Sequence, residues 1–144
     1  MNPPFKFSTL LKVRFNETDL QGHVNFAHYL SYFDVGLTEY LAAIGYSFEQ
    51  MLADGFDMVC AESHCQYHSP SRWAEVLNVH ARIGHLGRRS LRFEFDIRAA
   101  GDGRQVATGH IVAVTRERGS RAQKAILESM RRAVAHYEGA CEAE

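Results

Sequence analysis

The segment 17–25 contains the residue types best suited to chemistry in this 144-residue chain. It consists of Glu17, Thr18, Asp19, Leu20, Gln21, Gly22, His23, Val24 and Asn25. The segment lies between a strand-like run and a long apolar stretch with helical spacing. A helix N-terminus carries unpaired N–H groups and a partial positive charge, so it stabilises oxyanions. A carboxylate beside such donors could attack a carbonyl while the donors hold the developing charge. Asp19 or Asn25 could equally serve as a helix cap, because both residue types are favoured there.

Length and composition are typical of one globular domain. The chain is 46% hydrophobic and 23% charged, and 144 residues are enough to bury a core. We therefore expect a single domain over 1–144, with its core at about 7–116. The formal net charge of -1 gives no reason to expect a nucleic-acid partner.

The sequence shows no targeting signal and no disulfide pattern, so we expect a cytoplasmic protein. No apolar run approaches the roughly 20 residues that span a bilayer, so we expect no membrane partner. The N-terminus lacks the charged region and apolar block of a secretory signal. The three cysteines, Cys60, Cys65 and Cys141, are scattered and odd in number, which argues against a disulfide scaffold.

The first half of the chain predicts a strand, a long helix and a short helix. Alternating apolar residues indicate a strand over 7–15. Steps of three and four then define a helical stripe of Phe26, Tyr29, Leu30, Phe33, Leu37, Tyr40, Leu41 and Ile44, and Gly45 is the expected stop. Val35, Ala42 and Ala43 widen the stripe, so this helix should be mostly buried. Gly36 within it would be explained by a close approach of a sheet. A short helix is expected over 47–53.

The second half predicts four strands and a final helix. The strands are expected at about 56–67, 74–85, 89–99 and 105–116, with hairpin turns at 86–87 and 101–103. The clean alternation in the second and third of these strands favours an antiparallel sheet with one packed face. An amphipathic helix over 121–137 and a frayed tail at 139–144 close the chain. The order predicts an α+β domain with a five-stranded antiparallel sheet, one long central helix and a C-terminal helix.

At this point the chain resembles a known family. The segment 13–25, followed by Tyr29, Leu30, Ser31, Tyr32, Phe33 and Asp34, is similar to the signature of the hotdog-fold acyl-CoA thioesterases of the 4-hydroxybenzoyl-CoA thioesterase type. A second block is formed by Tyr67, His68, Ser69 and Pro70, with Leu77, Asn78 and Val79 after it. The resemblance implies a hotdog fold, in which the antiparallel sheet wraps around the central helix.

The same resemblance implies residue roles. Asp19 matches the catalytic carboxylate, and the backbone N–H of Phe26 would polarise the thioester carbonyl after a turn that Gly22 permits. Arg88 and Arg89 lie in the hairpin that, in the 4-hydroxybenzoyl-CoA enzyme, reaches the CoA nucleotide phosphates, so the resemblance implies a CoA-binding role for them. The expected substrate pocket comprises His23, Val24, Asn25, Tyr29, Glu62, Ser63 and His64. No metal and no cofactor are expected, since CoA is part of the acyl-CoA substrate.

The expected assembly is also taken from the family. Edge strands tend to pair, and the resemblance implies a homodimer joined along 56–67, which could pair again into a homotetramer. The site would then combine the Asp19 loop of one copy with residues 62–64 of the other.

Hydrolysis of a thioester suits these residues chemically. A free thiol has a pKa of about 8.5, so the leaving thiolate needs little help from an acid. Asp19 could attack to give a mixed anhydride or could deprotonate water, and the sequence leaves both routes open.

Other interpretations of the polar residues remain open. The spacing of Cys60, Glu62, His64 and His68 would place them on one strand face, but it matches no zinc signature. Arg88 and Arg89 could simply form a solvated turn. The fold also supports hydratases and dehydratases, which would use an aspartate–histidine pair, as well as acyl-CoA-binding modules without activity.

Overall fold

The structure is a computed structural model that describes residues 5–139. The elements in chain order are β1 (Phe7–Lys12), η1 (Phe15–Glu17), α1 (His28–Ala43), α2 (Phe48–Ala53), β2 (Phe56–Tyr67), β3 (Val76–Leu86), β4 (Ser90–Ala99), β5 (Gln105–Glu117) and α3 (Glu128–Glu138). The tail predicted at 139–144 lies outside the described residues except for Gly139, and so does Cys141. No helix within 5–139 is long and apolar enough to cross a membrane.

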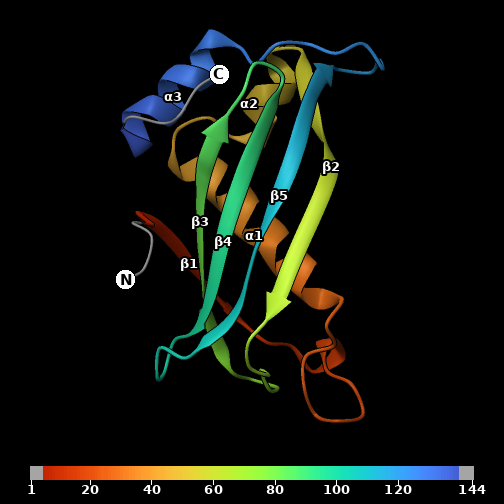
Figure 1. Ribbon diagram of the computed structural model, residues 1–144, viewed down its shortest axis with the longest axis vertical. Helices are drawn as coiled ribbons and strands as arrows, with labels where there is room; N and C mark the ends of the chain where they lie inside the picture. The colour runs from red at the N-terminus through yellow and green to blue at the C-terminus, as the bar shows by residue number, and fades with distance from the viewer. Residues whose placement is uncertain (1–4, 140–144) are drawn as a thin grey trace.

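The five strands form one antiparallel sheet in the order β1-β3-β4-β5-β2. The long helix α1 lies across one face of this sheet, and α3 packs at the end where β3 turns into β4 (Figure 1). The predicted turns are present, because the Gly87 N–H donates to the Ser90 carbonyl at 2.8 Å and Gly103 has a φ of +75°. The predicted α+β hotdog architecture is confirmed.

One face of α1 forms the core with the sheet. Its buried residues are Tyr29, Tyr32, Phe33, Gly36, Leu37, Tyr40 and Leu41. The Phe33 ring stacks on Phe95 with 4.5 Å between centroids. A Cβ on Gly36 would lie 2.7 Å from Cγ1 of Val79, closer than packed carbons approach. The close approach predicted at Gly36 is confirmed, and a larger residue there would require the Val79 side chain or α1 to shift.

The opposite face of α1 is open in the single chain. Leu30 and Val35 are 37% and 43% exposed, and Ala42 and Ala43 are exposed as well. The prediction of a mostly buried helix is therefore wrong for one chain, because the sheet covers only one side of α1. Apolar residues on the uncovered side leave a surface that a second layer could bury.

Strand β2 is an edge strand whose two faces exchange at a bulge. The pairing with β5 shifts register between Cys60 and Glu62. Residues opposite each other in an antiparallel pair share a face. Cys60 lies opposite Ala113, which is buried under α1, whereas His64 lies opposite His110 on the other face. The expectation that Cys60, Glu62 and His64 share one face is therefore wrong, because the extra residue at the bulge turns Cys60 toward the helix side.

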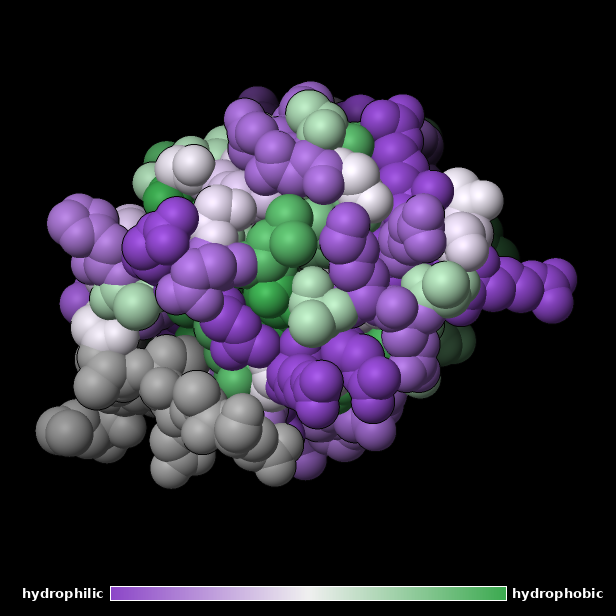
Figure 2. Space-filling model, turned by 90° about the horizontal axis from the view of Figure 1, so that it is seen from above, coloured by the Kyte–Doolittle hydropathy of each residue, from purple (hydrophilic) through white to green (hydrophobic). Residues whose placement is uncertain are grey.

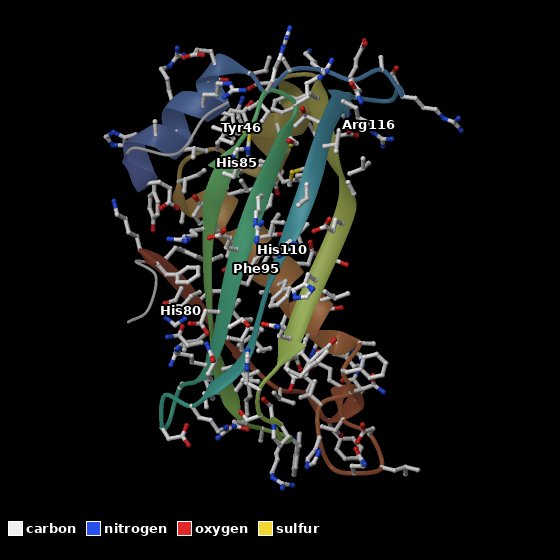
Figure 3. All side chains as sticks on the ribbon, in the orientation of Figure 1. Tyr46, His80, His85, Phe95, His110 and Arg116 are labelled. Carbon is white, nitrogen blue, oxygen red and sulfur yellow. The ribbon has the colours of Figure 1, made fainter. Side chains whose placement is uncertain are left out.

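The uncovered sheet face carries a polar cluster around His110, which Figure 3 labels near the middle of the sheet. Its Nε2 lies 2.6 Å from Oε2 of Glu62, and its ring stacks on that of His64 with 5.2 Å between centroids. The hydrogen bond with His110 lowers the pKa of Glu62. Within residues 5–139, no group of three or more His, Cys, Asp or Glu side chains is arranged to hold a metal ion.

Several element boundaries differ from the predictions, and three of the differences have a structural explanation. Strand β1 ends at Lys12, because residues 15–17 turn into η1. Helix α1 begins at His28, two residues after the first apolar residue of its stripe. Helix α3 begins at Glu128 instead of residue 121, since the preceding segment runs extended along the sheet. There the Lys124 N–H donates to Thr115 and the Ile126 N–H to Arg88, both to carbonyl oxygens.

Candidate active site

The segment 18–24 folds back on itself and presents Asp19. The Asp19 N–H donates to the His23 carbonyl at 2.9 Å, and the Gly22 N–H donates to the Asp19 carbonyl at the same distance. Gly22 has a φ of +77°, which L-residues rarely adopt, so the predicted glycine turn is present. The Gln21 N–H donates to Oδ1 of Asp19 at 2.9 Å. The carboxylate is thus oriented by the loop while the residue stays partly exposed.

Glu17 fixes the base of this loop. The residue is 7% exposed, and its carboxylate accepts hydrogen bonds from the Arg14 N–H at 2.8 Å and the Tyr32 hydroxyl at 3.0 Å. Its carbonyl accepts from the Asn25 N–H at 2.9 Å. Burial alone would raise the pKa of Glu17. The hydrogen bonds that its carboxylate accepts from the Arg14 N–H and the Tyr32 hydroxyl outweigh burial, together with the nearby Arg14 charge, and hold the pKa below the usual 4.5. Glu17 therefore joins both ends of the Asp19 loop to α1.

The lowered pKa of Glu17 makes its contribution to stability depend on pH. A carboxyl group whose pKa is lower in the folded state stabilises the fold above its unfolded-state pKa, and this stabilisation is lost as pH falls through the folded-state value. Replacing Glu17 with Gln removes the titration. We expect the stability gap between wild type and Glu17→Gln to be largest near neutral pH and to narrow in acid. Denaturant unfolding from roughly pH 3 to 7 measures this gap; a gap of constant size would contradict the role of the carboxylate.

A cleft of about 330 Å³ opens beside Asp19. It is lined by Asp19, Gln21, His23, Val24, Phe26, Tyr29, Tyr67, His68, Ser69 and Pro70. The Tyr67 ring lies edge-on to both Phe26 and Tyr29, at 6.3 and 5.5 Å between centroids. Burial raises the pKa of Tyr29, so its hydroxyl stays protonated at neutral pH. The structure thus brings Asp19, His23, Val24, Phe26 and Tyr29 together around one cleft.

The far wall of the cleft was absent from the predicted site residues. Tyr67 ends β2, and His68, Ser69 and Pro70 follow it. His68 therefore lies beyond the strand, with Nε2 at 2.8 Å from Oγ1 of Thr108. The signal that could have identified this wall was the second block of the family resemblance, which contains these four residues.

Of the backbone N–H groups of residues 26–29 at the start of α1, one has no hydrogen-bond acceptor within residues 5–139. The Ala27 N–H donates to Oδ1 of Asn25 at 3.0 Å, and the His28 N–H donates to the Asn25 carbonyl at 2.9 Å. The Tyr29 N–H donates to the Phe26 carbonyl at 3.3 Å. The Phe26 N–H has no acceptor within residues 5–139. Asn25 thus caps the turn before the helix, and the remaining donor belongs to a residue that lines the Asp19 cleft.

Asp19 and His23 do not form a side-chain pair. Their hydrogen bond joins the Asp19 N–H to the His23 carbonyl. In the described part of the chain, no hydrogen bond or ion pair connects the Asp19 carboxylate to the His23 imidazole. The aspartate–histidine pair expected of a hydratase is therefore not assembled here.

Glu62, Ser63 and His64 lie outside this cleft in the single chain. They occupy the middle of β2, whereas the cleft contacts only the last residue of that strand, Tyr67. Glu62 and His64 point to the uncovered sheet face, and Ser63, which lies opposite Ile111, points to the side of α1. Their predicted role in the substrate pocket stays a prediction, because it requires a second copy.

Arg88 and Arg89 lie at the opposite end of the sheet from Asp19. They are exposed in the turn between β3 and β4, which reaches the same end as Phe56, whereas Tyr67 marks the cleft end (Figure 1). β2 spans 12 residues, or about 40 Å at about 3.3 Å per residue. Figure 2 shows the end of the molecule that carries the turn between β3 and β4. This surface is largely hydrophilic, with a small apolar group near its centre. A CoA contact by these arginines stays a prediction.

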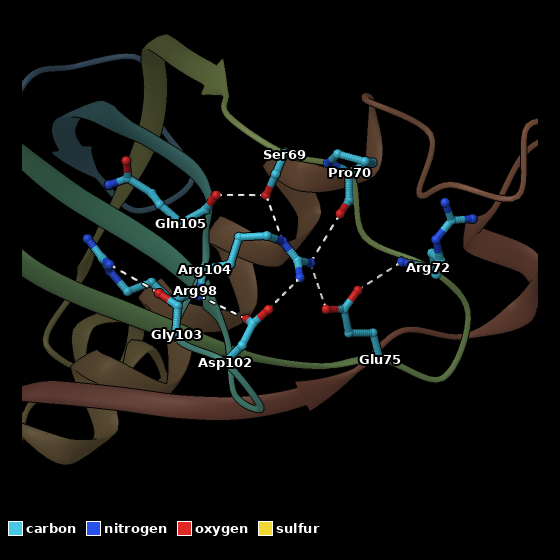
Figure 4. A network of polar contacts seen from close by, with 9 residues as sticks. All are labelled: Ser69, Pro70, Arg72, Glu75, Arg98, Asp102, Gly103, Arg104 and Gln105. Atoms are coloured by element: carbon cyan, nitrogen blue, oxygen red, sulfur yellow. Dashed lines mark hydrogen bonds and ion pairs between the residues drawn. The ribbon is translucent and has the colours of Figure 1, made fainter.

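Arg104 holds the wall beside the cleft in place. Its guanidinium donates to Oγ of Ser69 at 2.9 Å and to the Pro70 carbonyl at 3.2 Å. It also lies 2.7 Å from Oε2 of Glu75 and 3.2 Å from Oδ2 of Asp102 (Figure 4). The Arg104 guanidinium is therefore engaged in contacts that support the loop between β2 and β3.

Comparison with known proteins identifies the family of the chain. Residues 13–134 match the thioesterase-like superfamily, so the chain belongs to that family. A curated relative, a putative esterase of Aquifex aeolicus, is 31% identical over 84 residues, which cover 58% of this chain and 66% of the relative. The match thus spans slightly less than two thirds of that relative's length.

Solved structures share the fold over nearly the whole chain. A hypothetical protein of Thermus thermophilus is 28% identical with a TM-score of 0.82, covering 90% of this chain and 97% of its own. A 1,4-dihydroxy-2-naphthoyl-CoA thioesterase of Synechocystis is 16% identical with a TM-score of 0.83, covering 93% and 98%. At 16% identity the second likeness concerns the fold alone.

Proposed function

We propose that this protein hydrolyses an acyl-CoA thioester to a free acid and CoA. Asp19 acts as the nucleophile or as the general base toward water, and the Phe26 N–H stabilises the oxyanion. One observation carries the proposal: the partly exposed Asp19 carboxylate and the uncommitted Phe26 amide belong to residues that line the same cleft. Membership of the thioesterase-like superfamily supports the reaction class. The subtype resembling 4-hydroxybenzoyl-CoA thioesterase remains part of this proposal.

Aromatic side chains suggest where the acyl group would lie. Phe26, Tyr29 and Tyr67 all line the cleft and offer aromatic surface to an aryl or aliphatic group. Incubation with matched saturated and α,β-unsaturated acyl-CoA esters tests the reaction class. Thiol release from both supports hydrolysis. Loss of the double bond without thiol release would identify a hydratase, and binding without turnover would identify an acyl-CoA-binding module.

We also propose a homodimer joined along β2. The strand has one free edge over 12 residues, and unpaired edges favour association. The exposed apolar side chains on α1 provide further surface to bury. Antiparallel pairing of two β2 strands about their middle would place the Phe56 end of one copy beside the Tyr67 end of the other. The Arg88–Arg89 turn of one copy would then approach the Asp19 cleft of the second.

The dimer is tested by its mass in solution. We expect sedimentation velocity at assay concentration to give the mass of two chains, or of four if dimers pair again. A monomer with full thioesterase activity at the same concentration would contradict the composite site.

The arginine turn yields a separate kinetic prediction. Guanidinium groups bind phosphate oxygens through charge-assisted, often bidentate hydrogen bonds. Replacing Arg88 and Arg89 with alanine should raise KM for acyl-CoA and leave kcat nearly unchanged, because the contact is equal in ground and transition states. An acyl-pantetheine substrate, which lacks the nucleotide, should be hardly affected. Equal losses for both substrates would mean that the pair supports the fold.

A further inference from the structure

A second hollow, of about 600 Å³, adjoins the Asp19 cleft. It is lined by Ser69, Pro70, Arg72, Trp73, Ala74, Glu75 and Arg104, so Ser69 and Pro70 form the boundary between the two. A molecule whose reactive end lies at Asp19 could therefore continue over Ser69 and Pro70 into this hollow. The mechanism proposed above uses none of its other residues.

The hollow offers one free cation. Within residues 5–139, the Arg72 guanidinium forms no hydrogen bond and no ion pair, and in Figure 4 its side chain points away from the Arg104 network. Arg104 is committed to Glu75 and Asp102. Two arginines and one glutamate line the hollow, so its lining carries a net charge of +1. The Nη1 atom of Arg72 lies 3.9 Å from the position that a Cβ on Gly22 would take, which places the cation beside the Asp19 loop.

The hollow also offers an exposed aromatic surface. Trp73 is 63% exposed and Phe15 is 73% exposed, and their rings meet edge-on with 6.0 Å between centroids. Adjacent exposed aromatic side chains form an apolar patch, and such patches can mark binding sites. The two rings lie nearly perpendicular to each other, and most of Trp73 stays exposed beside the hollow.

The backbone holds Trp73 and Arg72 in this arrangement at a cost. Ala74 has a φ of +68°, the one positive φ at a non-glycine residue between 5 and 139. Such outliers persist where the surroundings enforce them, often at functional sites. The Ala74 N–H donates to the Val13 carbonyl and the Glu75 N–H donates to the Arg72 carbonyl, both at 3.1 Å. The tight turn therefore fixes the backbone from which the two exposed side chains project.

We infer that Arg72 and Trp73 bind the nucleotide end of CoA, with Trp73 stacking on the adenine and Arg72 contacting a phosphate. This inference rests on the proposed use of CoA thioesters and gives the substrate a nucleotide site within the same chain as Asp19. Bases stack on aromatic side chains, and guanidinium groups bind phosphate. CoA carries a diphosphate and a separate 3′-phosphate, so this site and the Arg88–Arg89 turn do not exclude each other.

The test uses the single tryptophan of the chain as its reporter. Adenosine 3′,5′-bisphosphate, the nucleotide end of CoA without its thioester arm, is titrated into the full-length protein while tryptophan fluorescence is recorded. We expect saturable quenching, weakened about tenfold by Arg72→Ala and also weakened for adenosine without phosphates. The control variant Arg132→Ala, which removes an exposed arginine on α3, should bind as wild type does. No quenching, or equal affinity of wild type and Arg72→Ala, would overturn the assignment.

Kinetics provide the second readout. Trp73→Ala should raise KM for acyl-CoA about tenfold, leave kcat nearly unchanged and leave acyl-pantetheine hydrolysis unaffected. The titration needs no turnover, so the two proposals fail separately. Quenching without any thiol release would refute the hydrolase and keep the nucleotide site. Thiol release without quenching would refute the nucleotide site and keep the hydrolase.

Discussion

Replacing Asp19 with Asn is expected to abolish most of the thioesterase activity while preserving the fold. The amide oxygen can still accept the hydrogen bond that the Gln21 N–H donates to Oδ1. The side chain is partly exposed, so its replacement removes no buried contact. Asn can neither attack the thioester as a carboxylate nor accept a proton from water. We expect kcat to fall by about 10²–10⁴-fold.

The control for Asp19→Asn is its own stability. Thermal midpoint and far-UV circular dichroism should match those of the wild type, and Glu17→Gln serves as a comparison in which the neighbouring carboxylate is changed instead. Near-normal turnover by a folded Asp19→Asn protein would remove Asp19 from the mechanism.

The second large effect is expected from the backbone at Phe26. Proline lacks an N–H, so Phe26→Pro removes the proposed oxyanion donor. Loss of one such donor lowers kcat by about 10²–10³-fold. Phe26→Ala is the matched control, because it removes the ring, which is 68% exposed, and keeps the N–H. We expect Phe26→Ala to alter KM more than kcat.

Stability measurements make the proline result interpretable. Phe26 precedes α1 and its own N–H has no acceptor within residues 5–139, so proline removes no internal hydrogen bond there. Both variants should unfold in one cooperative transition. If Phe26→Pro is folded and its kcat equals that of Phe26→Ala, the oxyanion donor lies elsewhere.

Periodic features of the sequence predicted most of the fold. Apolar residues alternate in β3 and β4 and recur every three or four positions in α1. These patterns indicate which face of each element is buried, and they predicted the sheet and the central helix. Gly36 was explained correctly, because its position on the buried stripe requires contact with the sheet. The Asp19 loop was also placed correctly, since Gly22 marks its turn.

Structural features that no periodic hydrophobic pattern marks could not be predicted from the sequence. The bulge in β2 adds one residue to a strand whose side chains are mostly exposed, so no apolar pattern marks the change of face. Ile126 is buried in an extended segment although its spacing continues the stripe of α3. Glu17 looks like a solvated loop residue, and its burial against Tyr32 depends on a contact across 15 positions. The distance between Asp19 and the Arg88–Arg89 turn likewise depends on strand order, which local sequence does not encode.

The most direct test of the central claim is the stoichiometry of the reaction at the Asp19 cleft. Wild type and Asp19→Asn, purified in parallel, are incubated with a panel of aryl, short-chain and long-chain acyl-CoA esters, and free thiol and free acid are both quantified. The proposed function predicts equal amounts of thiol and acid from at least one ester with wild type and near-background release with Asp19→Asn. Absence of release from every ester, or equal release by both proteins, would contradict it.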